Sequence, residues 1–189
     1  MSRRSWIQTL AVALGLAPLA WLGVAAAGDR LGANPIETIT HATGGWALRF
    51  LLVSLAVTPA RRWLGWSWAA PLRRTFGVIA FGHATLHLAT WLVLDLGFDL
   101  DAMLDDLIER RYIAAGAFAY ACLLPLALTS TGRSMKRFGR RWQTLHRLVY
   151  AAAIAAVVHF VWLVKADLLE PLCYAAALAL LLALRLRRR

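Results

Sequence analysis

The chain has 189 residues, of which 60% are hydrophobic, and its formal net charge is +11. Its charged residues fall in short clusters between long apolar runs, which is the composition of a polytopic membrane protein and not of a soluble domain. In such a protein the position of the positive charge matters more than its sum, so nothing here points to nucleic acid as a partner.

Six apolar runs are long enough, or nearly so, to cross a bilayer core of about 30 Å as helices. They cover residues 6–27, 43–59, 75–96, 112–129, 145–164 and 171–184. The first run exceeds the apolar region of about 7–15 residues that a cleaved signal peptide carries, so it is interpreted as a span. We therefore expect an all-α membrane bundle of about six transmembrane helices, forming a single domain over residues 1–189.

The basic residues are distributed unequally between the two sides of these spans. With the N-terminus inside, 16 Lys and Arg residues fall in inner segments and four in outer segments. This asymmetry predicts that both termini are cytoplasmic. The acidic residues all lie in or beside outer segments, several of them in residues 97–111, where apolar residues recur at helical spacing. That segment is expected to be an amphipathic helix on the outer surface.

Two ionisable residues lie in or just before the second span. His41 lies near the outer interface, where a histidine is usually solvated or hydrogen-bonded. Arg49 lies inside the span and is expected to extend its guanidinium to the interface, although an inward-pointing Arg49 could pair with an anionic group.

The third and fifth spans carry the other histidines. At a rise of about 1.5 Å per residue, His87 lies roughly 18 Å from the inner end of its span and His159 roughly 20 Å from the inner end of the fifth. Both spans run from inside to outside, so the two imidazoles are expected at nearly the same level, in the outer half of the membrane. His83 lies one turn below His87, and His146 lies at the inner surface.

Ionisable side chains at membrane depth usually mark a site, and three kinds of site fit this pattern. A b-type haem needs two neutral imidazoles on opposite sides of its plane. A zinc ion could use His83 and His87, but zinc usually takes three or four protein ligands and no span interior holds a carboxylate. The third interpretation is that these are hydrogen-bonded core histidines. A site for another metal and a proton relay are further alternatives.

The cysteines and the most basic inner loop add two further points. Cys122 and Cys173 are the only cysteines, each inside an apolar span, and no Cys-x-x-Cys-His motif for a covalently bound haem is present. In the inner loop 130–147, Arg140 and Arg141 could hold a phosphate or a haem propionate in addition to setting the topology.

A set of motifs is similar to that of the MsrQ family, formerly YedZ. The motifs are Gly32-Ala33-Asn34-Pro35, Arg73-Arg74 with Gly77, Ala84-Thr85-Leu86-His87-Leu88, Leu128-Thr129-Ser130-Thr131, the stretch RRWQTLHRLVY from Arg140 to Tyr150, and His159. The family comprises haem-binding membrane subunits of the bacterial periplasmic methionine-sulfoxide reductase system, within the ferric-reductase-like transmembrane superfamily. The resemblance covers most of the chain.

The resemblance implies an electron-transfer subunit, not a catalytic one, in the bacterial inner membrane. It implies one or two b-type haems, and the family is also described as binding FMN. Electrons would come from quinol or a cytoplasmic flavin reductase and pass to a periplasmic molybdopterin methionine-sulfoxide reductase, the catalytic subunit of a heterodimer. No Gly-x-Gly-x-x-Gly motif follows the last span, so a separate donor is expected.

The resemblance also implies a set of site residues. The motifs assign His87, His146 and His159 to haem iron, and we expect Arg74, Arg140 and Arg141 to contact a cofactor. His83 falls where the motif does not require histidine. The residue level with His146 on span three is near Arg74, which cannot ligate iron. His146 is therefore expected to use a ligand from elsewhere, to hold a second haem weakly, or to hydrogen-bond a quinone or flavin.

Other functions remain as alternatives. The chain could be a stand-alone ferric-reductase-like cytochrome or a histidine-dependent metal transporter. A transporter would normally show inverted repeats or interrupted helices, and the sequence shows neither. A structural scaffold would leave the paired histidines unexplained.

Overall fold

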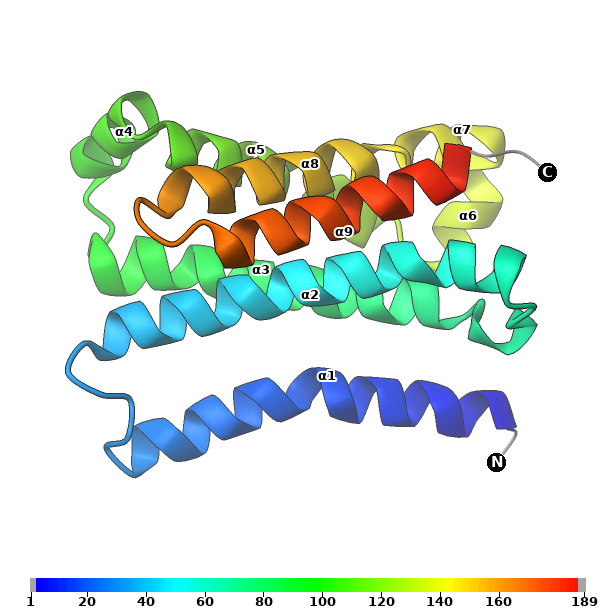
Figure 1. Cartoon of the computed structure of the whole chain (residues 1–189), viewed down its shortest axis with the longest axis horizontal. Coiled ribbons are helices and arrows are strands. Elements are labelled where there is room, and N and C mark those ends of the chain that lie inside the picture. Colours follow the sequence, from blue (N-terminus) through cyan, green and yellow to red (C-terminus); the bar gives the residue numbers. More distant parts are fainter. Residues whose placement is uncertain (1–2, 187–189) are drawn as a thin grey trace. The chain divides into compact units, whose positions relative to one another are not determined.

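The computed structural model describes residues 3–186, and within them every regular element is a helix (Figure 1). The terminal residues Arg187, Arg188 and Arg189, which contribute to the predicted topology, lie outside the described residues. The elements are α1 (Arg3–Ala27), α2 (Pro35–Trp63), η1 (Ser67–Ala69), α3 (Leu72–Ala89), η2 (Thr90–Asp95), α4 (Leu100–Glu109), α5 (Arg111–Leu128), α6 (Gly132–Phe138), α7 (Arg140–Leu145), α8 (Leu148–Leu163) and α9 (Leu169–Leu186).

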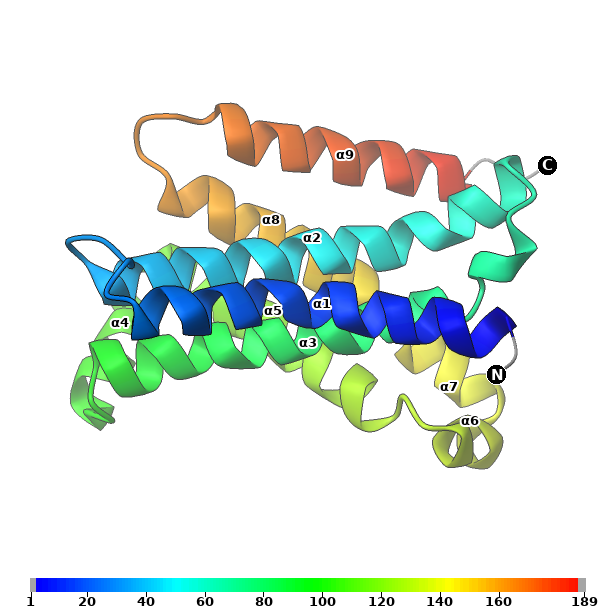
Figure 2. The same ribbon diagram turned by 90° about the horizontal axis from the view of Figure 1, so that it is seen from below.

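The chain forms two compact units, Met1–Leu100 and Asp101–Arg189, which are described separately. In the first unit, α2 and α3 pack along much of their length and α1 lies against α3 (Figure 2). In the second unit, α5 packs on α8, and α9 packs on α8. The single domain expected from the sequence stays a prediction.

Helix α2 begins eight residues before the expected start of the second span. Asn34 caps it, since its side chain accepts a hydrogen bond of 3.2 Å from the Glu37 amide. Pro35 occupies the first helical position. A backbone N–H at this position makes no hydrogen bond within the helix, so proline, which lacks the N–H, costs no helical hydrogen bond there. The Asn34-Pro35 turn therefore starts the long helix itself.

Close contacts join the three helices of the first unit. Ser54 Oγ on α2 donates a hydrogen bond of 2.7 Å to the Arg73 carbonyl at the start of α3. A methyl group added at Gly15 of α1 would stand 2.6 Å from Ile79 Cδ1 of α3, so glycine allows these two helices to approach. After Ala89 the third span continues as the π-helical segment η2, where a regular helix was expected.

The second unit differs from the expected fifth span near its start. Helix α7 ends at Leu145 and α8 begins at Leu148, so His146 lies at a break between two helices. In the first turn of α8, the Tyr150 hydroxyl accepts a hydrogen bond of 2.8 Å from Arg185 Nη1 of α9.

The amphipathic helix expected over residues 97–111 is α4. Its apolar residues Leu100, Leu104 and Ile108 are 58–79% exposed. Asp106 is buried and pairs with Arg110 at 3.0 Å, so one acid of this helix turns inward.

Five helical stretches among the described residues are long and apolar enough to cross a membrane. They are Ser5–Ala27, Pro35–Trp63, Ser67–Asp95, Arg111–Leu128 and Arg140–Leu163. The all-α, multi-pass membrane class is thereby confirmed. The expected sixth span lies within α9, which is not one of these five, so the number of spans stays a prediction.

Candidate functional site

His87 lies on α3 and contacts α2. Its Nδ1 atom is 2.9 Å from the Thr40 carbonyl oxygen. A carbonyl oxygen only accepts hydrogen bonds, so Nδ1 carries the proton and Nε2 of the neutral ring bears the lone pair. A methyl group added at Gly44 would stand 2.9 Å from His87 Cε1 and 3.0 Å from Nδ1. The His87 ring thus lies so close to α2 that a side chain larger than that of glycine at residue 44 would collide with it.

His159 has the same surroundings in the second unit. Its Nδ1 atom is 2.6 Å from the Tyr112 carbonyl oxygen on α5, so Nδ1 again donates the hydrogen bond. A methyl group added at Gly116 would stand 2.8 Å from His159 Nδ1 and 3.1 Å from Cε1. In both cases the histidine follows its carbonyl partner by 47 residues. Both histidines are half-buried.

These two histidines fit the ligands of a haem. A metal-binding imidazole normally donates its other ring N–H to a carbonyl or carboxylate, which fixes the tautomer and the ring orientation. His87 and His159 both do so through Nδ1, which leaves Nε2 as the nitrogen for iron. Each histidine would thus bind iron through Nε2, and a haem held there would supply one-electron transfer. The assignment of both histidines to one haem stays a prediction.

His83 does not share this arrangement. Its Nε2 donates a hydrogen bond of 2.9 Å to the Gly15 carbonyl of α1, and the residue is 2% exposed. Nδ1 is buried with no hydrogen-bond partner among the described residues. His83 and His87 therefore bond to different helices and form no zinc-binding pair. Among the described residues no cluster of three or more His, Cys, Asp or Glu could hold a metal ion.

His146 has a third type of environment. Its Nε2 lies 3.1 Å from Thr129 Oγ1, which itself lies 2.6 Å from the Pro125 carbonyl. A threonine hydroxyl has one proton, and the shorter contact uses it, so Oγ1 accepts from His146 Nε2–H. For His146 to bind iron through Nε2, that nitrogen must lose its proton and its contact with Thr129.

The arginines expected to contact a cofactor lie at the surface of the chain. Arg74 lines a cleft of about 630 Å³ between α1 and α3, together with Gln8 and His83. Arg140 and Arg141 are exposed on α7. Arg49 is half-buried, with its guanidinium 4.9 Å from the centre of the Trp46 ring. The cofactor contacts of Arg74, Arg140 and Arg141 stay predictions, as does the snorkelling of Arg49.

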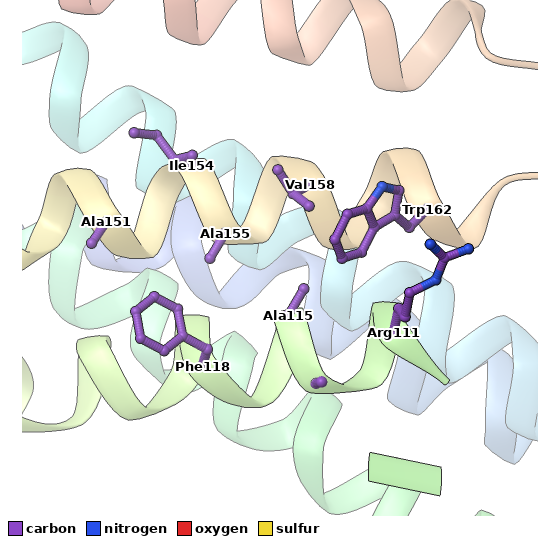
Figure 3. A pocket seen from close by; sticks show the side chains of 9 residues that line it. Arg111, Ala115, Phe118, Ala151, Ile154, Ala155, Val158 and Trp162 are labelled. Atoms are coloured by element: carbon purple, nitrogen blue, oxygen red, sulfur yellow. The ribbon is translucent and has the colours of Figure 1, made fainter. Parts of the chain in front are cut away.

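A second cleft, of about 590 Å³, opens between α5 and α8 (Figure 3). Alanines of both helices line it together with Phe118 and Trp162, and the Arg111 guanidinium lies 5.8 Å from the Trp162 ring centre. No histidine lines this cleft.

Four residues at the histidines were not identified from the sequence. They are Thr40 and Tyr112, whose carbonyl groups accept the hydrogen bonds, and the glycines Gly44 and Gly116. A comparison of the chain with itself would have found the glycines, because each precedes its histidine by the same number of residues. No side-chain pattern could have found the two carbonyl groups, since every residue carries one.

The long apolar helices define the chain as a multi-pass membrane protein. The family model described as "Ferric reductase like transmembrane component" matches residues 43–157. The protein-methionine-sulfoxide reductase heme-binding subunit MsrQ of Rhodospirillum rubrum is 49% identical over 90% of this chain and 83% of its own length. The subunits of the same name from Azospira oryzae (49% identical, 85% of this chain and 70% of the relative) and Brucella ovis (43%, 97% and 83%) are also similar.

The chain therefore belongs to the MsrQ family of ferric-reductase-like transmembrane proteins. The family resemblance inferred from the motifs is confirmed. No solved structure matches the chain.

Proposed function

We propose that the chain is the haem-binding, electron-transferring membrane subunit of a methionine-sulfoxide reductase system. The observation that carries this proposal is the pair of hydrogen bonds from His87 Nδ1 and His159 Nδ1 to main-chain carbonyls. They fix the proton of each ring on Nδ1, so that Nε2 is the nitrogen that would bind iron. The curated relatives, which are named as heme-binding subunits of such a system, support the same function.

His87 and His159 are the proposed axial ligands of one b-type haem. Their expected depths of roughly 18 and 20 Å differ by about one residue's rise. This level, in the outer half of the membrane, suits delivery of electrons to an acceptor on the outer side. Arg74, Arg140 and Arg141 are proposed to bind anionic cofactor groups near the inner surface, where FMN or a second haem at His146 would lie.

The proposed membrane is the bacterial inner membrane. The donor is quinol or a cytoplasmic flavin reductase, and the acceptor is a periplasmic molybdopterin methionine-sulfoxide reductase that forms a heterodimer with this chain. The chain's own contribution is to hold and orient the imidazoles in a site from which apolar helices exclude water.

The test is an absorption spectrum of the purified protein, oxidised and dithionite-reduced, after haem-replete expression. We expect a Soret band with sharp reduced α and β bands in the unmodified protein. His87→Ala and His159→Ala should each abolish this low-spin spectrum. The matched control is His83→Gln, one turn from His87, whose amide can still donate to the Gly15 carbonyl; it should keep the bands. A colourless unmodified protein would contradict the proposed function.

A further inference from the structure

The surroundings of the two candidate ligands repeat along the chain. A shift of 72 residues takes Thr40 to Tyr112, Gly44 to Gly116 and His87 to His159. The same shift takes the Nδ1–carbonyl hydrogen bond of the first unit onto that of the second. It also takes the close approach of glycine and imidazole from one unit to the other.

The buried positions follow the same shift. Ala80 on α3 and Ala152 on α8, each seven residues before its histidine, are both fully buried. On the partner helices the matching buried pairs are Phe50 and Cys122, Leu51 and Leu123, and Ser54 and Leu126. Helices α2 and α3 are therefore one copy, and α5 and α8 a second copy, of the same packed helix pair.

The likeness is confined to the core and to the surroundings of the ligand. The 72-residue shift takes His83 to Ala155 and Arg74 to His146. These pairs have different side chains and different contacts. What the two copies share beyond packing is the arrangement of glycine, carbonyl and histidine.

The glycines of this arrangement differ from a glycine that serves helix packing. The three atoms nearest to a methyl group at Gly44 all belong to His87, and those nearest to one at Gly116 all belong to His159. At Gly15, by contrast, the nearest atoms belong to the aliphatic side chain of Ile79. The space left at Gly44 and Gly116 is thus taken up by an imidazole ring, whereas the space at Gly15 is taken up by an aliphatic side chain.

We propose that Gly44 and Gly116 are positioning residues for the two haem ligands, a role that rests on the proposed function. Each glycine lets the imidazole lie against the opposite helix, where the carbonyl one turn earlier holds Nδ1–H. Together these contacts fix the ring plane and the tautomer in each copy. A larger side chain would displace the ring, because the imidazole is the mobile partner in the contact.

The two glycines have unequal consequences for Nε2. A methyl group at residue 44 would stand 3.4 Å from His87 Nε2, the atom that would bind iron. At residue 116 the three nearest atoms are His159 Nδ1, Cε1 and Cγ, so the methyl group would act on the hydrogen-bonded side of the ring. Gly44→Ala should therefore have the larger effect on iron binding.

The test compares Gly44→Ala and Gly116→Ala with a matched control, Gly23→Ala. Gly23 is also a helical glycine in a membrane-spanning helix, and a methyl group there meets nothing within 4 Å. The measurements are the haem-to-protein ratio, the reduced α and β bands, and the midpoint potential from a redox titration. We expect haem retention to weaken on the order of 10- to 100-fold in both glycine variants, as for other changes around metal-binding histidines. Gly23→Ala should match the unmodified protein.

The outcomes separate this inference from the proposed function. If the unmodified protein and Gly23→Ala are both colourless, the proposed function fails. If both bind haem and the Gly44 and Gly116 variants keep the same ratio, bands and potential, the positioning role is wrong and the function stands. Because the two glycines lie in different units, one variant that does not fold leaves the other as an independent test.

Discussion

His146 and Trp142 stack, with their ring centroids 3.8 Å apart and their planes at 27°. The Trp142 indole N–H donates to the Thr129 carbonyl at 2.9 Å, and the Thr129 hydroxyl contacts His146 Nε2. Three residues at the inner end of the second unit thus hold one another in a closed set of contacts. This set orients His146 independently of any cofactor.

Thr129→Val should loosen this set of contacts. It removes the acceptor of the His146 Nε2–H hydrogen bond while keeping the side-chain shape, so the free energy of unfolding should fall by about 1 kcal/mol. Reversible unfolding in mixed micelles measures the change. An unaltered unfolding free energy would show that the hydroxyl makes no net contribution.

His146→Ala should leave the α and β bands of the proposed His87–His159 haem at their positions. The reason is that His146 Nε2 is already engaged by Thr129. The haem-to-protein ratio of the same variant reports whether His146 holds a second haem. Loss of all bands would contradict the assignment of the axial ligands.

Gly15→Ala should separate α1 from α3. The added methyl group would stand 2.6 and 2.9 Å from two Ile79 carbon atoms, and such overpacking costs about 1–3 kcal/mol. Limited proteolysis at the connection between α1 and α2, together with unfolding in micelles, measures the effect. Gly23→Ala on the same helix is the control, and equal stability of the two variants would be evidence against the contact.

A reporter fused to the C-terminus should lie in the cytoplasm. The distribution of Lys and Arg predicts that both chain ends are inside, and this topology requires α9 to cross the membrane as a sixth span. Fusions to a fluorescent protein that folds only inside, and to a phosphatase active only outside, distinguish the two sides. Phosphatase activity at the C-terminus would mean that α9 does not cross.

Five of the spans could be predicted because hydropathy marks them. The depths of the histidines depend on the fixed rise of a helix and stay predictions. The start of α2 at Pro35 was missed because hydropathy marks only the apolar run from residue 43. The helix itself extends through the polar residues before that run to its cap at Asn34. The break at His146 was also missed, since residues 140–163 contain enough apolar residues to read as one continuous span.

The roles of the individual histidines could not be predicted from spacing. His83 and His87 lie one turn apart, yet one bonds to α1 and the other to α2. Which neighbour a side chain meets depends on where the other helices pack, and hydropathy does not encode that. The hydrogen-bonded core interpretation holds for His83, and the arrangement expected of a metal ligand holds for His87 and His159.

Each candidate ligand is anchored by a main-chain oxygen, and any amino acid supplies one. The two anchoring positions are Thr40 and Tyr112, whose side chains have little in common. A substitution at either position leaves the main-chain carbonyl acceptor in place, so many amino acids should be tolerated there. A change at the glycine one turn later has no such tolerance. Random mutagenesis of the two segments should therefore return many substitutions at the anchors and few at the glycines.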